Sequence, residues 1–294
     1  PQAAAPEPGS WRSPELSDAL FADAESSAIL SPPLILERAR ESLALFREGG
    51  DLAGMGNALF TLGNTSWQKG ELATARFHLE ESLKLSTETG DKFIMAWSLT
   101  VLSVVNFDQG DYTQGYSHAE AGLLLCRERG DKRGIAHALN QLAYGHLCEG
   151  DAVKAHPLFE ESYALSKEIG DKGTERFAFS CLGWVAFRQG KISLARSLLE
   201  EGLANYQGVE DPVDLDNHQA WVLSHLAQVV AFEGDYARAR ALYEQCLAIS
   251  KQVRGWKIYI PLYLEGLAAV VAGQGERLWA ARLWGTAEVL REGM

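Results

Sequence analysis

The chain has 294 residues, of which 47% are hydrophobic and 22% charged, so it can bury a core and does not have the composition of a disordered chain. Aspartate and glutamate number 39 against 27 lysines and arginines, a formal charge of −12, which disfavours direct nucleic-acid binding because phosphate recognition needs clustered positive charge. No apolar run approaches the roughly 18 residues of a membrane span, and the opening residues lack the features of a signal peptide, so we expect a cytoplasmic protein.

The first 49 residues differ in pattern from the rest of the chain. Residues 1–12 are rich in proline and alanine, and we expect a linker or disordered tail there. Residues 13–49 are predicted to form a degenerate first repeat, broken at Pro32 and Pro33, because ESLAL at residues 41–45 matches ESLKL at residues 81–85. The chain opens without methionine and ends at Glu-Gly-Met, so we expect it to be part of a longer protein.

From residue 50 onward, glycines mark a repeat. A Gly-Asp dipeptide recurs at intervals of 40 residues, a second glycine recurs halfway, and four extra residues lie within the acidic stretch 210–217. The dipeptides begin at Gly50, Gly90, Gly130 and Gly170, and the halfway glycines are Gly70, Gly110, Gly150, Gly190 and Gly234. Glycine suits the left-handed residue that ends a helix, and the aspartate after it can cap the next helix, as at Asp111 and Asp151.

Between these turns the apolar residues follow helical spacing, so each repeat is predicted to be two amphipathic helices. We expect an all-α fold, a right-handed α-solenoid of antiparallel helix hairpins with about six to seven repeats. The predicted array covers residues 50–294, divided into 50–89, 90–129, 130–169, 170–209, 210–253 and 254–294.

Small residues recur where the two helices of each pair must approach closely. In the first helix they are Gly63, Ser103, Ala143, Gly183, Ala227 and Ala268; in the second they are Ala75, Gly115, Ala155, Ala195, Ala239 and Ala280. The residue four positions after the second small residue fills the space between the helices in most copies: Leu79, Ala119, Phe159, Leu199, Tyr243 and Trp284.

This pattern of small, small and large residues resembles the tetratricopeptide repeat signature over about residues 30–294. The 40-residue period and the ends EESLKL at residues 80–85 and EESYAL at 160–165 resemble the repeats of MalT-like bacterial regulators. The closing segment, residues 280–291, is similar to the end of the helical arrays in large LuxR-type transcriptional regulators that carry an ATPase module. No Walker loop is present, because the one similar segment, around Gly190, has Val185 and Ile192 at key positions.

The resemblance implies that the first helix of each pair lines a concave groove, with groove-facing residues at fixed offsets from its small residue. The amides, histidine and aromatic residues at these offsets are the candidate ligand-binding residues: Asn57, Asn64, Trp97, His137, Asn140, Tyr144, Phe177, Trp184, Trp221 and Gln228. Carboxamides can donate and accept hydrogen bonds to an extended peptide, and flat aromatics supply contact area. The alternative is that aromatics such as Trp97, Trp184, Phe107 and Phe187 pack between adjacent first helices.

No catalytic residues, metal site or cofactor are predicted. The histidines lack metal-ligand spacing, the four cysteines are expected to be free thiols within helices, and the paired glutamates recur in each repeat, as on a solvated helix face. The chain is therefore predicted not to be an enzyme.

Two functions remain open at the level of sequence. The first is a non-catalytic protein-interaction or ligand-sensing domain, a fragment of a bacterial transcriptional regulator, with a peptide, protein or small effector in its groove. The alternative is a free-standing cytoplasmic adaptor or scaffold unrelated to transcription. A homodimer through the last helix is also possible, because Leu283, Trp284, Ala287 and Leu290 form an apolar stripe there.

Overall fold

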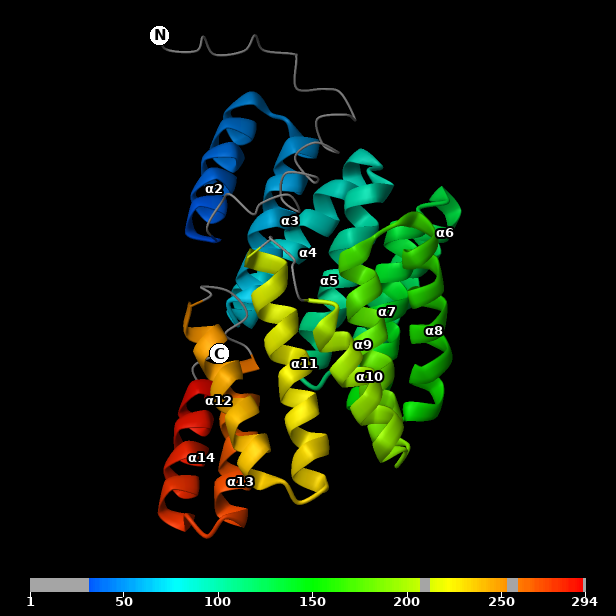
Figure 1. Ribbon diagram of the computed structural model, residues 1–294. Coiled ribbons are helices and arrows are strands. Elements are labelled where there is room, and N and C mark those ends of the chain that lie inside the picture. The colour runs from blue at the N-terminus through cyan, green and yellow to red at the C-terminus, as the bar shows by residue number, and fades with distance from the viewer. Residues whose placement is uncertain (1–31, 207–211, 253–258, 293–294) are drawn as a thin grey trace, which may run out of the picture.

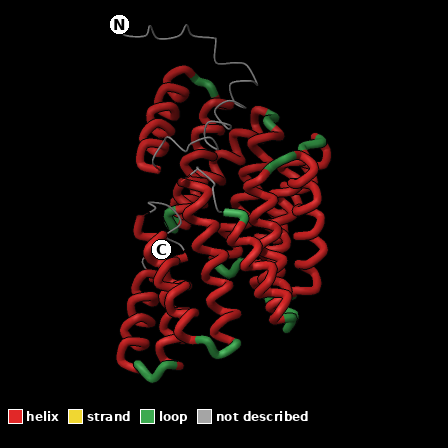
Figure 2. The backbone as a smooth tube through the Cα atoms, viewed as in Figure 1, coloured by secondary structure: helices red, strands yellow, loops and turns green. Residues whose placement is uncertain are grey.

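The computed structural model describes residues 32–206, 212–252 and 259–292, which form helices joined by short turns (Figure 2). The predicted tail 1–12, the first part of the predicted degenerate repeat and the start of the acidic stretch 210–217 lie outside this range. The helices are α2 (Pro32–Gly49), α3 (Leu52–Gln68), α4 (Leu72–Thr89), α5 (Lys92–Asp108), α6 (Tyr112–Arg129), α7 (Lys132–Cys148), α8 (Ala152–Ile169), α9 (Lys172–Arg188), α10 (Ile192–Ala204), α11 (Pro212–Phe232), α12 (Tyr236–Gln252), α13 (Ile260–Gly273) and α14 (Arg277–Glu292). Within the described ranges, no helix is both long enough and apolar enough to cross a bilayer.

Consecutive helices pack as antiparallel pairs, and the pairs stack into a curved superhelix (Figure 1). The most extensive contacts join α3 to α4, α5 to α6 and α7 to α8. The array curves back, so that α12 to α14 lie on the same side of the molecule as α2 and α3 in this view (Figure 1). The predicted all-α superhelix of hairpins is therefore confirmed.

The turns have the chemistry that the Gly-Asp repeat predicts. All the repeat glycines adopt positive φ values, such as 72° at Gly90 and 69° at Gly130, where other residues are strained. After them, aspartate side chains accept hydrogen bonds from the first turn of the next helix, as from the Gly134 amide to Asp131 at 2.9 Å. The caps at Asp111 and Asp151 form in the same way, with donors three residues ahead.

The small residues lie at the centre of each hairpin, because only a small side chain lets the helices approach this closely. A Cβ added at Gly63 would lie 2.6 Å from Cγ of Leu79, and one at Gly183 would lie 2.8 Å from Cγ of Leu199. Both leucines and Phe159 are fully buried, as the pattern predicts. Trp284 differs, because 48% of it is exposed and Ala287 instead takes the buried position on α14.

The four extra residues of the fifth repeat lengthen its first helix. Helix α11 has 21 residues, whereas α3, α5, α7 and α9 each have 17. The preceding helix α10 has 13 residues, compared with 18 in α8. The repeat therefore changes its geometry between α10 and α11, and the large core cluster that includes Phe159, Trp221 and Tyr243 extends across this junction.

Candidate functional site

The first helices of the pairs form a continuous inner wall. Contacts join α3 to α5, α5 to α7, α7 to α9, α9 to α11 and α11 to α13, so each first helix touches the next one along the array. Because alternate helices meet only on the inner side of a curved stack of hairpins, this wall is the concave face.

The structure buries three of the predicted groove residues within the wall. Trp97 is 7% exposed, and Asn140 and Trp221 are each 2% exposed. Their side chains pack between neighbouring first helices, as the ring centroids of Trp97 and His137 show at 4.9 Å and those of Phe177 and Trp221 at 5.6 Å. Asn140 keeps one unusual feature, since its Oδ1 atom is buried and has no hydrogen-bond partner among the described residues.

The other seven predicted residues are partly exposed: Asn57, Asn64, His137, Tyr144, Phe177, Trp184 and Gln228. Among them, Trp184 on α9 lies between aromatic residues of the two adjacent first helices. Its ring centroid is 6.5 Å from that of Tyr144 on α7 and 5.6 Å from that of Trp221 on α11. The side chains of Asn57 and Asn64 form no hydrogen bond with any other side chain that the structure describes, so both amides are available to a ligand.

The surroundings of His137 are those of a neutral side chain that packs between helices, and they do not favour a charged imidazole that contacts a ligand. Burial lowers its pKa to about 4, although Asp171 acts in the opposite direction. The Nε2 atom lies 2.9 Å from Oγ1 of Thr174, and the ring packs against Trp97 with an angle of 60° between the ring planes. His137 is therefore neutral at physiological pH and links α7 to α9.

A polar cluster lies on the same wall, and we call it the Asp108 cluster: Trp67, Asp108, Tyr144, Cys148 and Tyr259. The indole Nε1 of Trp67 donates to Oδ2 of Asp108 at 2.8 Å, and the Tyr144 hydroxyl donates to Oδ1 at 3.4 Å. Tyr259 and Cys148 lie beside Tyr144, because both add to the effect of burial in raising the pKa of its hydroxyl. Residues from α3, α5, α7 and the start of α13 therefore meet at one carboxylate.

The carboxylate of Asp108 has an unfavourable electrostatic environment. Burial raises its pKa to about 6, and the hydrogen bonds from Trp67 and Tyr144 only partly oppose this shift. Asp108 is also the last residue of α5, where the helix dipole disfavours negative charge. It forms no ion pair with any residue that the structure describes, so nothing in this region compensates its charge.

Of this cluster, only Tyr144 is among the candidate ligand-binding residues predicted from the sequence. Asp108 and Cys148 lie five residues after Ser103 and Ala143, one position beyond the last offset of the repeat signature. A signal was present, because this position holds Gln68, Asp108, Cys148 and Arg188 in successive copies and so differs in chemistry each time. No sequence pattern pointed to Tyr259, because only the curvature of the whole array brings the start of α13 next to α5 and α7.

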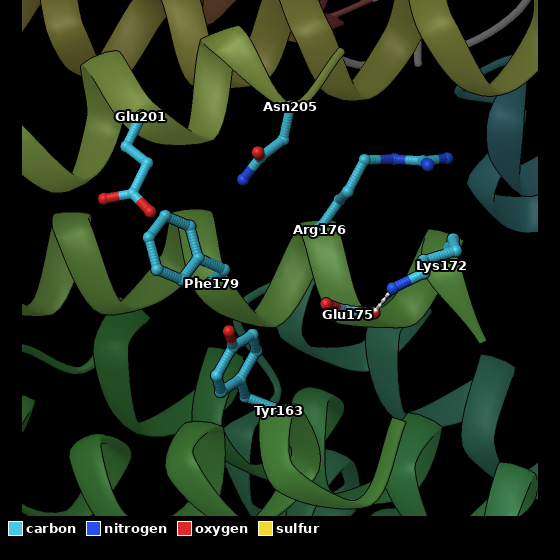
Figure 3. Close-up of a pocket in the computed structure, with 7 residues that line it drawn as sticks. All are labelled: Tyr163, Lys172, Glu175, Arg176, Phe179, Glu201 and Asn205. Atoms are coloured by element: carbon cyan, nitrogen blue, oxygen red, sulfur yellow. Dashed lines mark hydrogen bonds and ion pairs between the residues drawn. The ribbon is translucent and has the colours of Figure 1, made fainter. Parts of the chain in front are cut away.

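A second candidate is a pocket of about 260 Å³ on the outer side, between α8, α9 and α10 (Figure 3). It is lined by Tyr163, Lys172, Glu175, Arg176, Phe179, Glu201 and Asn205. Where the preceding repeat has Ile135 and Ala136, this one has Glu175 and Arg176, so polar groups replace apolar ones.

Three of the four charged side chains that line the outer pocket have partners among the described residues. Lys172 pairs with Glu175 at 2.6 Å (Figure 3). The Arg176 guanidinium lies 5.4 Å from the ring centroid of Tyr206. The Asp108 cluster contains a carboxylate without such a partner, so the concave face is the stronger candidate site. No group of three potential metal ligands occurs in the part of the chain that the structure describes.

The stacked hairpins, the glycine turns and the inner wall together define a helical repeat protein of the kind that presents a concave surface. The chain is a tetratricopeptide repeat array: models of the tetratricopeptide repeat match residues 94–168 and 219–255. Such repeats are generally non-catalytic protein-interaction scaffolds, and neither match describes a catalytic family. A search of proteins with curated functions finds no match.

Several solved structures share the fold. RapI in its apo form aligns with a TM-score of 0.67 at 11% identity, covering 94% of this chain and 95% of that one. NprR in complex with its cognate peptide NprX aligns with a TM-score of 0.62 at 12% identity, covering 88% and 78%. A Rap protein complexed with Competence and Sporulation Factor aligns with a TM-score of 0.61 at 13% identity, covering 92% and 74%. At these identities the likeness establishes the fold.

Proposed function

We propose that this chain is a non-catalytic interaction domain that binds an extended peptide or protein segment on its concave face. The observation that carries the proposal is the Asp108 cluster, a set of polar groups on the inner wall that is partly accessible and contains an uncompensated carboxylate. Buried polar groups are normally fully paired in folded proteins, so exceptions gather at sites where a ligand completes the pairing. NprR and the Rap protein, which share the fold, are described with bound peptides or factors, and this favours the same use of the groove here.

The neighbouring residues suit a peptide backbone. Asn64 offers a carboxamide that can donate and accept at once, and Asn57 lies two helical turns before it on α3. The rings of Tyr144 and Trp184 provide flat contact area with little entropy to lose on binding. A segment bound along the wall would therefore contact amides from α3 and aromatics from α7 and α9.

Selection of peptides from a displayed random library, followed by titration calorimetry with the intact chain, tests this function. We expect Asn64→Ala to weaken the selected peptides about fivefold, because one neutral hydrogen bond contributes roughly 1 kcal/mol. Asn205→Ala, which removes the same side chain from the outer pocket, is the matched control and is expected to leave affinity unchanged. Absence of any selected peptide, or sensitivity to Asn205→Ala instead, would contradict binding on the concave face.

We further propose that the domain belongs to a bacterial transcriptional regulator of the MalT-like or LuxR type and acts in the cytoplasm. The 40-residue period and the closing segment of residues 280–291 support this origin. In such a protein, ligand binding would alter the curvature of the array, because small rotations between repeats add along a solenoid. The alternative is a free-standing adaptor, and determining the full reading frame around this segment distinguishes the two, since an adaptor would lack a DNA-binding module.

A homodimer through α14 is part of the same proposal. Of the predicted stripe, Trp284 and Leu290 are 48% and 42% exposed, whereas Ala287 is fully buried and Leu283 packs against the core. Leu278 and Val289 on the same helix are 82% and 68% exposed and add to its apolar surface. We expect sedimentation equilibrium to show a dimer that Trp284→Glu converts to a monomer, whereas Phe77→Glu on α4 should not alter the mass. A monomeric wild-type chain at micromolar concentration would exclude this dimer.

A further inference from the structure

The contacts of Asp108 leave part of its hydrogen-bonding capacity unused. Each carboxylate oxygen accepts one hydrogen bond, from Trp67 at 2.8 Å and from Tyr144 at 3.4 Å. An ionised carboxylate has about four acceptor positions, so each oxygen can still accept another donor. Both existing donors are neutral, and they supply no counter-charge.

The elements packed around Asp108 bring no cation to it. Helix α3 contributes Trp67, α7 contributes Tyr144 and Cys148, the start of α13 contributes Tyr259, and α6 contributes Tyr112 at longer range. All of these side chains are neutral near pH 7, because burial raises the pKa of Cys148 to about 12 and raises those of the tyrosines as well.

Two basic side chains in this part of the array have other interactions. Arg76 donates to Asn106 at 2.6 Å and also to Gln109, and Lys69 lies 3.9 Å from Glu71. Arg188 affects the pKa of Cys148 but is not among the groups that shift the pKa of Asp108. The described part of the chain therefore leaves this carboxylate without a positive partner.

Aromatic rings surround the same carboxylate. Trp67 and Tyr144 contact it directly, Tyr259 is linked to it through Tyr144, and Trp184 lies beyond Tyr144 with ring centroids 6.5 Å apart. Aromatic rings attract cations through their quadrupoles, and a carboxylate surrounded by such rings forms a site complementary to an ammonium or guanidinium group. A neutral donor could use the free acceptor positions, but only a cation would also supply the missing counter-charge.

We infer that the ligand places a positively charged nitrogen group, the side chain of arginine or lysine or an N-terminal ammonium, against Asp108 between Trp67, Tyr144 and Tyr259. This inference rests on the proposed binding of a peptide on the concave face, and it assigns the chemistry of one ligand position. Ion pairing at this position would replace the missing counter-charge and use the free acceptor positions of both oxygens.

The test uses Nα-acetyl-arginine amide and its neutral analogue Nα-acetyl-citrulline amide as probes. Binding is followed by NMR through the resonance of the Trp67 indole N–H, the group that donates to Asp108. The resonance is assigned by its loss in the Trp67→Phe variant. We expect the arginine probe to bind at least about tenfold more tightly than the citrulline probe, because hydrogen bonds between charged groups are stronger than neutral ones. Nα-acetyl-lysine amide and alanine amide with a free amino group then identify which cation the site prefers.

Asp108→Asn is expected to remove the preference for arginine over citrulline, whereas Glu201→Gln, which removes the same charge from the outer pocket, should keep it. If the arginine and citrulline probes bind the wild-type chain with equal affinity, that result alone would overturn the inference. If library peptides bind, lose affinity with Asn64→Ala and show no enrichment of basic residues, the groove function stands and the cation inference fails. If no library peptide binds and the probes leave the Trp67 resonance unchanged, both fail.

Discussion

Replacing Phe159 by alanine is expected to lower the free energy of unfolding by about 3–5 kcal/mol, the cost of removing a fully buried aromatic side chain and leaving a cavity. Phe159 is completely buried and belongs to the largest described core cluster. The same cluster contains Ala143 and Leu147 on α7 and Val185 on α9, so it joins two successive repeats.

Urea denaturation followed by circular dichroism measures this loss. Phe77→Ala on α4 is the matched control, because Phe77 is 60% exposed and its truncation should change stability by no more than about 0.5 kcal/mol. Phe159→Leu should fall between the two, since leucine fills part of the cavity and already occupies this position as Leu79 and Leu199 in other repeats. A loss below about 1 kcal/mol for Phe159→Ala would show that this interface does not depend on the buried ring.

Replacing Asp108 by asparagine is expected to stabilise the ligand-free protein at pH 7 by about 1–2 kcal/mol. Burial raises the pKa of this carboxyl from 3.8 to about 6, so the folded state disfavours its ionised form. The full shift corresponds to roughly 3 kcal/mol, and we expect less because an asparagine amide presents a donor to Trp67 or Tyr144 in place of one acceptor oxygen.

The pH dependence of this effect has a definite sign. Because the folded-state pKa lies above that of the unfolded chain, the folded state binds the proton more tightly, and the contribution of Asp108 to stability is complete below pH 3.8 and lost as the pH rises through about 6. The gain from Asp108→Asn should therefore be near zero at pH 4 and complete at pH 7. Urea midpoints at both pH values, with Glu201→Gln as a charge-matched control, measure it. A destabilised Asp108→Asn variant at pH 7 would mean that the ionised carboxylate has a counter-charge within the protein.

Such a cost is typical of a residue retained for binding rather than for stability. Ionised Asp108 destabilises the free chain, and a ligand cation would offset that cost on binding. The urea denaturation and the probe titration therefore test the same carboxylate. Asp108→Asn is expected to raise the free energy of unfolding of the ligand-free protein and to reduce its preference for a cationic ligand.

The amino-acid sequence by itself determined the repeat unit, because each of its signals acts over a few residues. Gly90 and Gly130 end helices with positive φ, Asp131 caps the next helix, and the close approach of Gly63 to Leu79 sets the packing of a hairpin. Turn conformation, capping and the spacing of apolar residues all depend on local geometry, so the hairpins and their boundaries follow from pattern alone.

Only the tertiary structure decided which inner-wall residues are buried and which meet. The repeat signature places Asn140, Tyr144 and Trp221 all at groove-facing offsets, yet Asn140 and Trp221 are buried while Tyr144 remains partly exposed. Asp108 receives a hydrogen bond from Trp67, 41 residues away, and Tyr259 reaches the same cluster from the start of α13. These contacts depend on the rotation between successive hairpins, and that rotation accumulates over the whole array, so no single repeat encodes it.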